Sequence, residues 1–255
     1  MKAGSGSGQF AKTLTIYGRK PVLEALADTS LAVTTLHVAD SNQSGGIMAN
    51  IVTLASRRGV EIRDHSRDTL ARISRNKKQD QGVALDVSCP RFATIDQFLH
   101  RAGDKQLRLL ALDGITNPQN VGMIIRSAVA GGIDGIIYPR RGVAALGPLV
   151  IKASAGTVFR APICVCDTLT TPLNDLKAAG FDIATLEGIA NDSLFDYQAR
   201  AGTVFVLGGE TEGVSVASQS IASIRLRIPM ARGVESLNVA VAASLIAYAP
   251  YLARH

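Results

Sequence analysis

The sequence predicts a soluble α/β protein in which a small α/β domain precedes a larger domain built on a parallel sheet. From Leu14 onward, short apolar runs alternate with helix-like segments, which is typical of α/β architecture rather than of a sandwich or a helical bundle. The run LRLLALDG at 107–114 is apolar on both faces, as expected of a central parallel strand covered by helices on each side. A break at Cys89-Pro90 separates the two groups of elements.

The first domain is predicted over residues 13–88, after a flexible Gly/Ser-rich tail at 1–12. Helices are expected where apolar residues recur with a helical period, as Ile47, Ile51 and Leu54 do before Gly59. The expected elements are a helix at 21–28, a strand at 34–40, a helix around 47–55, a strand at 60–65, a basic helix at 66–78 and a strand at 82–88.

A linker at 89–106, which includes a helical connector at 94–105, leads to the second domain at 107–255. The glycine pair 131–132 is expected to end the first helix of that domain. The expected elements are strands at 107–114, 135–139, 161–165, 181–187, 203–209 and 223–230, helices at 120–130 and 168–180, and a final helix from near Ser236.

Composition excludes several classes of protein. The chain of 255 residues is 47% apolar, which is enough for a sizeable core, and no run approaches the ~18 apolar residues that span a bilayer. The three cysteines and four histidines show neither a disulfide framework nor the spacing of a zinc site, so we expect no metal. The N-terminus lacks the apolar core of a secretory signal. A cytoplasmic protein without a membrane partner is predicted.

The positive charge is concentrated in the first domain. The chain carries a net charge of +6, and residues 1–90 hold 12 basic and 8 acidic side chains, hence +4 of that total. The segment 57–78 is especially basic, and such a local field attracts polyanions. Taken alone, the same run is equally well explained as the solvated face of a helix.

Three segments place glycines and polar side chains just beyond the ends of apolar strands, where open α/β sheets bind ligands. They are NPQNVGMIIRSA (117–128), LGGETEGVS (207–215) and IPMARGVESLNVAVAAS (228–244). Taken singly, their residues have ordinary structural explanations. Asn120 either caps a helix or lies in its first turn, and Ser236 is expected to cap the last helix with Asn238 in its first turn. Asn120 and Arg126 do not share a helical face, because they are six residues apart.

The joint appearance of these segments in this order resembles the three motifs of the SpoU/TrmH group of the SPOUT superfamily. That group consists of RNA ribose 2′-O-methyltransferases that use S-adenosylmethionine. The resemblance covers 107–250. Residues 14–88, with YGRKPVLEAL and NKKQDQGVAL, are similar to the ribosomal-protein-like substrate-binding domain of many members, although Asp80 stands where relatives often have histidine.

The resemblance implies a parallel sheet with a C-terminal trefoil knot, an exception to the rule against knots, and a homodimer formed through the knotted domain. It implies structured RNA as the partner, with ribosomal RNA favoured and transfer RNA open. It also implies that Arg126 is the electrostatic partner of the ribose 2′-oxygen. The implied catalytic residues are Asn120, Arg126, Glu210, Ser236 and Asn238, the implied cofactor-binding residues are Gly208, Gly209, Ile228, Met230 and Leu237, and the expected RNA-binding residues are Arg67, Arg72, Arg75, Lys77 and Lys78.

Three other hypotheses compete with a ribose methyltransferase. A nicotinamide-dependent Rossmann enzyme needs G-x-G-x-x-G after its first strand, and the sequence lacks it. A non-catalytic RNA-binding protein of the same fold would have kept the motif residues without the activity. A base methyltransferase would use the same site for a different acceptor.

Overall fold

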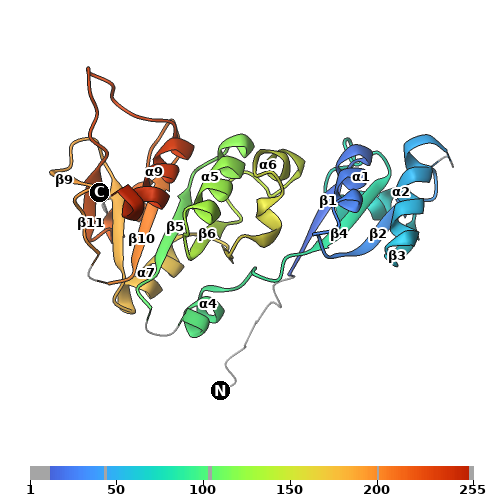
Figure 1. Ribbon diagram of the computed structural model, residues 1–255, viewed down its shortest axis with the longest axis horizontal. Coiled ribbons are helices and arrows are strands. Elements are labelled where there is room, and N and C mark those ends of the chain that lie inside the picture. The colour runs from blue at the N-terminus through green and yellow to red at the C-terminus, as the bar shows by residue number, and fades with distance from the viewer. Residues whose placement is uncertain (1–11, 43–44, 103–104, 200, 253–255) are drawn as a thin grey trace. The chain divides into compact units, whose positions relative to one another are not determined.

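The computed structural model describes residues 12–42, 45–102, 105–199 and 201–252 (Figure 1). It divides into two compact units, residues 1–92 and 93–255. The expected tail at 1–12 lies outside the described residues apart from Lys12. The division falls inside the segment predicted to link the two domains.

The first unit is a four-stranded sheet with helices packed against it. Strand order is β1-β4-β2-β3, with β4 antiparallel to both β1 and β2, and β2 parallel to β3. Leu70 of the third helix packs against Ala39 and Ala84 of the sheet. The elements are β1 (Thr13–Tyr17), α1 (Arg19–Ala27), β2 (Val33–Ala39), α2 (Gly46–Arg57), β3 (Glu61–His65), α3 (Arg67–Ser74) and β4 (Val83–Ser88).

Two features of this unit differ from the expectation. Strand β1 is absent from the predicted elements, and it pairs along its whole length with β4, a contact that its short sequence does not reveal. Helix α3 ends at Ser74 rather than near residue 78, because Arg75 takes a left-handed conformation with φ 55°. Residues 75–82 then form a loop around the buried carboxylate of Asp80. Ser66 caps α3, since its side chain accepts a hydrogen bond from the Thr69 N–H.

In the second unit the described strands form a seven-stranded sheet in the order β7-β6-β5-β10-β8-β11-β9, and all its pairings are parallel. The α/β expectation with a parallel sheet is confirmed, whereas the knot stays a prediction. The elements are α4 (Ile95–Ala102), β5 (Arg108–Asp113), α5 (Pro118–Ala130), β6 (Gly135–Pro139), α6 (Pro148–Ala153), η1 (Thr157–Arg160), β7 (Ile163–Cys166), α7 (Thr170–Ala178), β8 (Asp182–Leu186), β9 (Asp192–Ser193), β10 (Thr203–Gly208), α8 (Val216–Ile221), β11 (Ile224–Arg227) and α9 (Val239–Leu252).

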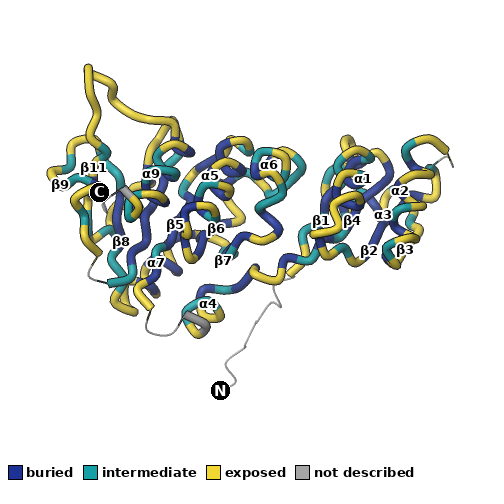
Figure 2. The backbone as a smooth tube through the Cα atoms, viewed as in Figure 1, coloured by how far each residue is buried: buried dark blue, intermediate teal, exposed yellow. Residues whose placement is uncertain are grey.

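Helices cover this sheet in two layers. Leu173 of α7 and Ile221 of α8 share a core cluster with Leu109 and Val204 of the central strands. The neighbouring strand residues point to the opposite face, because side chains alternate along a strand. Helices α5 and α9 pack against each other, and Figure 1 shows them in front of the sheet. The central strands β5 and β10 are therefore buried on both faces, as Figure 2 shows.

The segment expected to be a linker contributes to the second unit. Ala93 forms a parallel bridge with Cys164 beside β7, and Ile95 of α4 belongs to the core cluster. The helical connector at 94–105 is present as α4. The end of one strand and the start of one helix also differ from the expectation. Strand β11 stops at Arg227 instead of Met230, and α9 starts at Val239 instead of Ser236. The segment 228–238 between them is mostly exposed (Figure 2).

Arg108 stabilises the last helix at a point where its own hydrogen bonding is interrupted. Pro250 lies inside α9 and has no N–H to donate to the carbonyl of Ile246, four residues earlier. The Arg108 guanidinium donates instead to the carbonyl oxygens of Ile246 at 2.5 Å and Ala247 at 3.0 Å. Burial lowers the pKa of this guanidinium. The start of β5 is thus attached to the last turns of α9.

We expect Arg108→Met to lower the free energy of unfolding by about 2 kcal/mol, since a partly buried carbonyl loses a charged donor. Adding Pro250→Ala should recover part of this loss, because an alanine at that position supplies an N–H to the Ile246 carbonyl. Urea denaturation of the two single variants and the double variant measures this coupling. Losses that simply add would contradict the proposed role of Arg108.

Among the described residues, no helix is both long enough and apolar enough to cross a membrane.

Candidate functional site

A cleft of about 440 Å³ lies at the carboxyl ends of β8, β10 and β11 in the second unit. Because these strands are parallel neighbours, the loops that follow them meet at one edge of the sheet. Most of its lining side chains are aliphatic, and it also contains the carboxylates of Glu187, Glu210 and Glu235. Its volume and its mixture of apolar and polar groups are typical of a small-molecule site.

Beside this cleft, three side chains from the three sequence motifs form one hydrogen-bonded cluster, Asn120–Glu210–Asn238. Asn120 Nδ2 donates to Glu210 Oε1 at 2.5 Å. Asn238 Nδ2 lies 3.1 Å from Glu210 Oε1 and 3.2 Å from Asn120 Oδ1. The residues are separated by up to 118 positions in the chain, so only the fold brings them together.

Asn120 is positioned by the first turn of α5. Asn117, not Asn120, caps this helix, because its side chain accepts a hydrogen bond from the Gln119 N–H at 2.9 Å. Pro118 occupies the first helical position, where its missing N–H costs nothing. Of the two predicted alternatives for Asn120, the structure shows the first-turn position, with the residue only 3% exposed.

Glu210 is positioned by a tight turn after β10. Gly209 and Gly213 form an isolated antiparallel bridge, and Gly213 has φ 67°. A Cβ atom on Gly208 would lie 2.1 Å from the backbone carbon of Gly213, so only glycine permits this close approach. The loop is also held to the neighbouring strand, because Ser215 donates both its N–H and its hydroxyl to the Asp113 carboxylate.

Asn238 holds the N-terminal end of α9. Its Oδ1 accepts a hydrogen bond from the Ala240 N–H at 2.8 Å, which is the contact expected of a helix cap. The prediction that Ser236 caps this helix is therefore wrong: α9 starts at Val239, so Ser236 is too early in the chain for that role. Ser236 instead lines the cleft. Asn238 is therefore both the cap of α9, through Oδ1, and a member of the polar cluster, through Nδ2.

The residues predicted to bind the cofactor all line the cleft, namely Gly208, Gly209, Ile228, Met230 and Leu237. The cleft is also lined by three residues that were not among the predicted site residues, Leu186, Glu187 and Gly188. Glu187 and Gly188 directly follow the apolar strand β8, so they show the same pattern as the three motifs, a polar residue and a glycine just beyond the end of a strand. They lie outside the three segments that resemble the SpoU/TrmH motifs.

Arg126 is not in this cleft. It lies on α5 with an exposed side chain, and among the described residues it has no hydrogen-bond or ion-pair partner. Its neighbour Met123 is 40% exposed, and on the adjacent helix α9 Val241, Tyr248 and Tyr251 are 47%, 41% and 52% exposed. The predicted catalytic arginine therefore lies on the outward face of α5 together with the exposed Met123, and the adjacent helix α9 leaves three further apolar side chains exposed.

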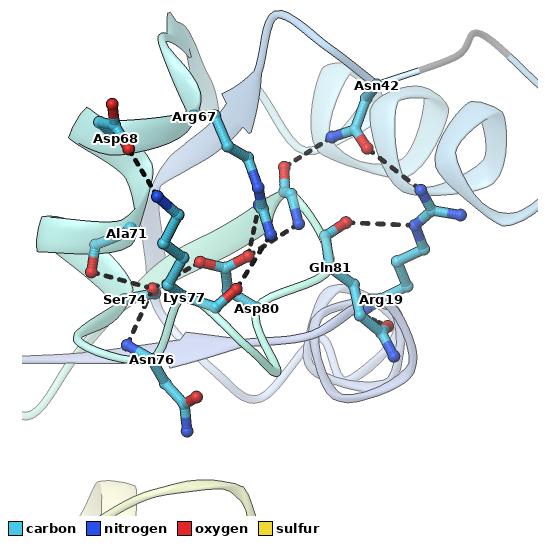
Figure 3. A network of polar contacts seen from close by, with 11 residues as sticks. Arg19, Asn42, Arg67, Asp68, Ala71, Ser74, Asn76, Lys77, Asp80 and Gln81 are labelled. Atoms are coloured by element: carbon cyan, nitrogen blue, oxygen red, sulfur yellow. Dashed lines mark hydrogen bonds and ion pairs between the residues drawn. The ribbon is translucent and has the colours of Figure 1, made fainter.

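In the first unit, Asp80 organises the loop between α3 and β4 (Figure 3). Its carboxylate is completely buried, and it accepts hydrogen bonds from the Arg67 guanidinium at 2.5 Å, the Ser74 hydroxyl at 2.8 Å and the Gly82 N–H at 3.0 Å. Arg67 also donates to the carbonyl oxygen of Lys77. Arg67 thus compensates a buried charge, which is a structural role.

The other four predicted RNA-binding side chains belong to residues at the surface of α3 and the following loop. Lys77 pairs with Asp68 at 2.8 Å, and this hydrogen bond lowers the pKa of the Asp68 carboxyl. Arg72, Arg75 and Lys78 have no ion-pair or hydrogen-bond partner within the part of the chain that the structure describes. On the same loop, Gln81 accepts two hydrogen bonds from Arg19, one from its backbone N–H and one from its side-chain Nε–H (Figure 3). The end of α3 and the loop after it thus present three cations that form no ion pair or hydrogen bond within the described residues, although Arg72 acts electrostatically on Asp68.

Comparison with known proteins agrees with these features. Residues 107–248 match the model of the SpoU rRNA Methylase family, and residues 15–93 match the model named RNA 2′-O ribose methyltransferase substrate binding. A protein of Mycobacterium avium (strain 104), named "Uncharacterized tRNA/rRNA methyltransferase", is 33% identical over 92% of this chain and 76% of its own length.

Solved structures show the same fold. The SpoU methyltransferase AviRb from Streptomyces viridochromogenes, in complex with the cofactor AdoMet, is 25% identical with a TM-score of 0.62, covering 96% of this chain and 91% of its own. An AdoMet-bound rRNA methyltransferase from Sinorhizobium meliloti is 23% identical with a TM-score of 0.59, covering 93% and 86%.

These matches define the class of protein: the chain is an RNA methyltransferase with an N-terminal substrate-binding domain. It belongs to the SpoU methylase family, in the SpoU/TrmH group that its three motifs resemble. The predicted family, enzyme class and cofactor of that family, S-adenosylmethionine, are confirmed.

Proposed function

We propose that this protein transfers a methyl group to a ribose 2′-hydroxyl of structured RNA, with ribosomal RNA as the favoured substrate. The observation that carries the proposal is the Asn120–Glu210–Asn238 cluster, in which one polar residue from each of three distant motifs meets beside a cleft of ligand size. We propose a cytoplasmic location as well, because that is where a bacterial-type RNA methyltransferase meets its RNA substrate.

The cleft fits S-adenosylmethionine on the chemistry of its lining. Leu186, Ile228 and Leu237 offer apolar contact to an adenine ring, and the Gly208-Gly209 turn leaves main-chain groups uncovered by side chains. The three glutamates make the cleft negative, which suits a ligand with a sulfonium and an ammonium group. When bound, this cofactor supplies an activated methyl group.

The residues of the chain orient the acceptor and stabilise charge. Glu210 is held by two amides, and Asn120 is buried, so the cluster is rigid before any ligand binds. Arg126 stabilises the negative charge that develops on the ribose 2′-oxygen, because a guanidinium stays charged and offers several donors. Ser236, on the cleft wall, takes part in positioning the ligand.

A second copy of the chain completes the site. Arg126 has no hydrogen-bond or ion-pair partner among the described residues of its own chain, and it shares the outward face of α5 with the exposed Met123, while the neighbouring helix α9 exposes Val241 and Tyr248. A homodimer through this face buries Met123, Val241 and Tyr248, and brings Arg126 of one protomer to the cleft of its partner. An isologous interface provides this contact twice.

The first unit binds the RNA substrate. Arg72, Arg75 and Lys78 contact phosphates, because their exposed side chains form no ion pair or hydrogen bond within the described part of the chain. Lys77 contributes less, since Asp68 neutralises it. Arg67 contributes less to the proposed RNA contacts, because its guanidinium is engaged by the buried Asp80.

The activity test uses labelled S-adenosylmethionine with total RNA. We expect label in a 2′-O-methyl nucleoside after nuclease digestion, and we expect that nucleoside in ribosomal RNA. Label in a base would contradict ribose methylation, and label confined to transfer RNA would contradict the favoured substrate. A protein that binds RNA and incorporates no label would be a non-catalytic member of the family.

A further inference from the structure

Glu187 is a carboxylate of the cleft to which the proposed mechanism assigns no contact of its own. It follows β8 directly, and its N–H donates to the Leu226 carbonyl of β11 at 2.8 Å, so its backbone is fixed at the sheet edge. Its side chain is 21% exposed and lines the cleft between Leu186 and Gly188. A partly buried carboxylate in this position needs hydrogen-bond donors or a cation as partners.

The structure supplies partners for one oxygen of this carboxylate. The Thr185 hydroxyl donates to Glu187 Oε1 at 3.0 Å, and Thr185 itself is completely buried. Arg225 Nε lies 3.6 Å from the same oxygen. Among the described residues, Oε2 accepts no hydrogen bond. Since an ionised carboxylate has about four lone-pair sites, the group is held in one orientation and keeps acceptor capacity.

The position of Glu187 relative to the polar cluster indicates which part of a ligand it meets. Glu210 follows β10, and β8 is the next strand in the sheet, about 4.8 Å away. The methyl group must lie near the Asn120–Glu210–Asn238 cluster, where the acceptor is bound. In S-adenosylmethionine the sulfonium bears the methionine chain and, through C5′, the ribose, so both are neighbouring parts of the molecule; the ribose is the part that offers hydroxyl groups. Its two hydroxyls are hydrogen-bond donors.

We propose that the Glu187 carboxylate accepts hydrogen bonds from the ribose hydroxyls of the methyl donor, and that it thereby selects a ribonucleoside. This inference depends on the proposed function of the cleft as the cofactor site. Glu187 is a specificity-determining residue that acts by charge-assisted hydrogen bonds. Glu210 is committed to Asn120 and Asn238, and Glu235 is exposed, which leaves Glu187 as the carboxylate suited to this role.

Calorimetric titration of the full chain tests this with S-adenosylhomocysteine and with its 2′-deoxyribose and 3′-deoxyribose analogues. The wild-type protein should bind the parent compound about 10- to 100-fold more tightly than at least one analogue, because a hydroxyl bonded to a carboxylate is lost. In Glu187→Gln this ratio should shrink to a few-fold. Glu212→Gln removes the same charge from an exposed residue outside the cleft, and it should keep the wild-type ratio.

Two results would overturn the proposed role of Glu187 and leave the proposed function of the cleft intact. The first is a wild-type protein that binds both deoxy analogues as tightly as the parent compound, a measurement that needs no variant to fold. The second is a Glu187→Gln variant that weakens all three ligands equally, which would assign the carboxylate to another part of the ligand. Failure of the wild-type protein to bind S-adenosylhomocysteine would instead contradict the proposed function of the cleft.

Discussion

Replacement of Arg126 by alanine should lower the rate of methyl transfer by about 1,000-fold while the affinity for S-adenosylmethionine stays nearly unchanged. The size follows from removing a charged donor that acts on the oxygen where charge develops. The affinity should persist because the proposed partner of Arg126 is the ribose 2′-oxygen of the RNA and not the cofactor. Single-turnover rates and calorimetry measure the two quantities separately. A parallel loss of cofactor affinity and rate would show that Arg126 binds the cofactor instead.

The same residue provides a test of the dimer. In a mixture of Arg126→Ala and Asn120→Ala protomers that exchange freely, about half of the dimers are mixed, and each mixed dimer has one site with both residues intact if Arg126 acts across the interface. The mixture should therefore recover about one quarter of the wild-type rate. Each variant alone should remain inactive, which is the control.

If Arg126 acts within its own chain, no site in the mixture is intact, and the mixture should be as inactive as its components. Size-exclusion chromatography with light scattering shows whether both variants remain dimers. Inactivity of verified mixed dimers would contradict the proposed contribution from the partner protomer.

Replacement of Arg67 by methionine should destabilise the first unit by about 2 to 3 kcal/mol, because it leaves the buried carboxylate of Asp80 without its cation. Adding Asp80→Asn should recover part of the loss, since the uncompensated charge disappears. Chemical denaturation followed by circular dichroism measures both. An Arg67→Met protein of wild-type stability would contradict the structural role.

Arg72→Met is the matched control, because Arg72 lies on the same helix without a hydrogen-bond or ion-pair partner among the described residues. Its stability should change by no more than about 0.5 kcal/mol. It should instead weaken RNA binding and reduce the slope of log affinity against log salt by about 1, as expected for one lost phosphate contact. Unchanged RNA affinity would remove Arg72 from the proposed RNA surface.

Several elements were predictable because their information is local. Helix α2 follows from the period of its apolar residues, and β5 from an apolar run that is buried on both faces. Strand β1 was not predictable, because five residues with partial burial become a strand only through pairing with the distant segment β4. The early end of α3 follows from the left-handed conformation of Arg75, which a residue pattern does not reveal.

For the cleft, the motifs placed Gly208, Glu210 and Asn238 near strand ends, and the sheet order then placed those ends side by side. Glu187 was missed because a single glutamate after a strand is common and belongs to no motif. Arg67 was expected to bind RNA because its charge is visible in the sequence, while its partner Asp80 lies 13 residues away and is buried only in the folded loop.

The α/β class, the order of most elements, the enzyme family and the identity of the motif residues could all be read from the chain alone, because periodicity and motifs are properties of short segments. Three facts required the folded molecule: Asn120, Glu210 and Asn238 share hydrogen bonds, Asn238 rather than Ser236 caps α9, and Arg126 is exposed outside the cleft. Hydrogen bonds and burial depend on distances between segments far apart in the chain, and those distances exist only once the sheet has formed.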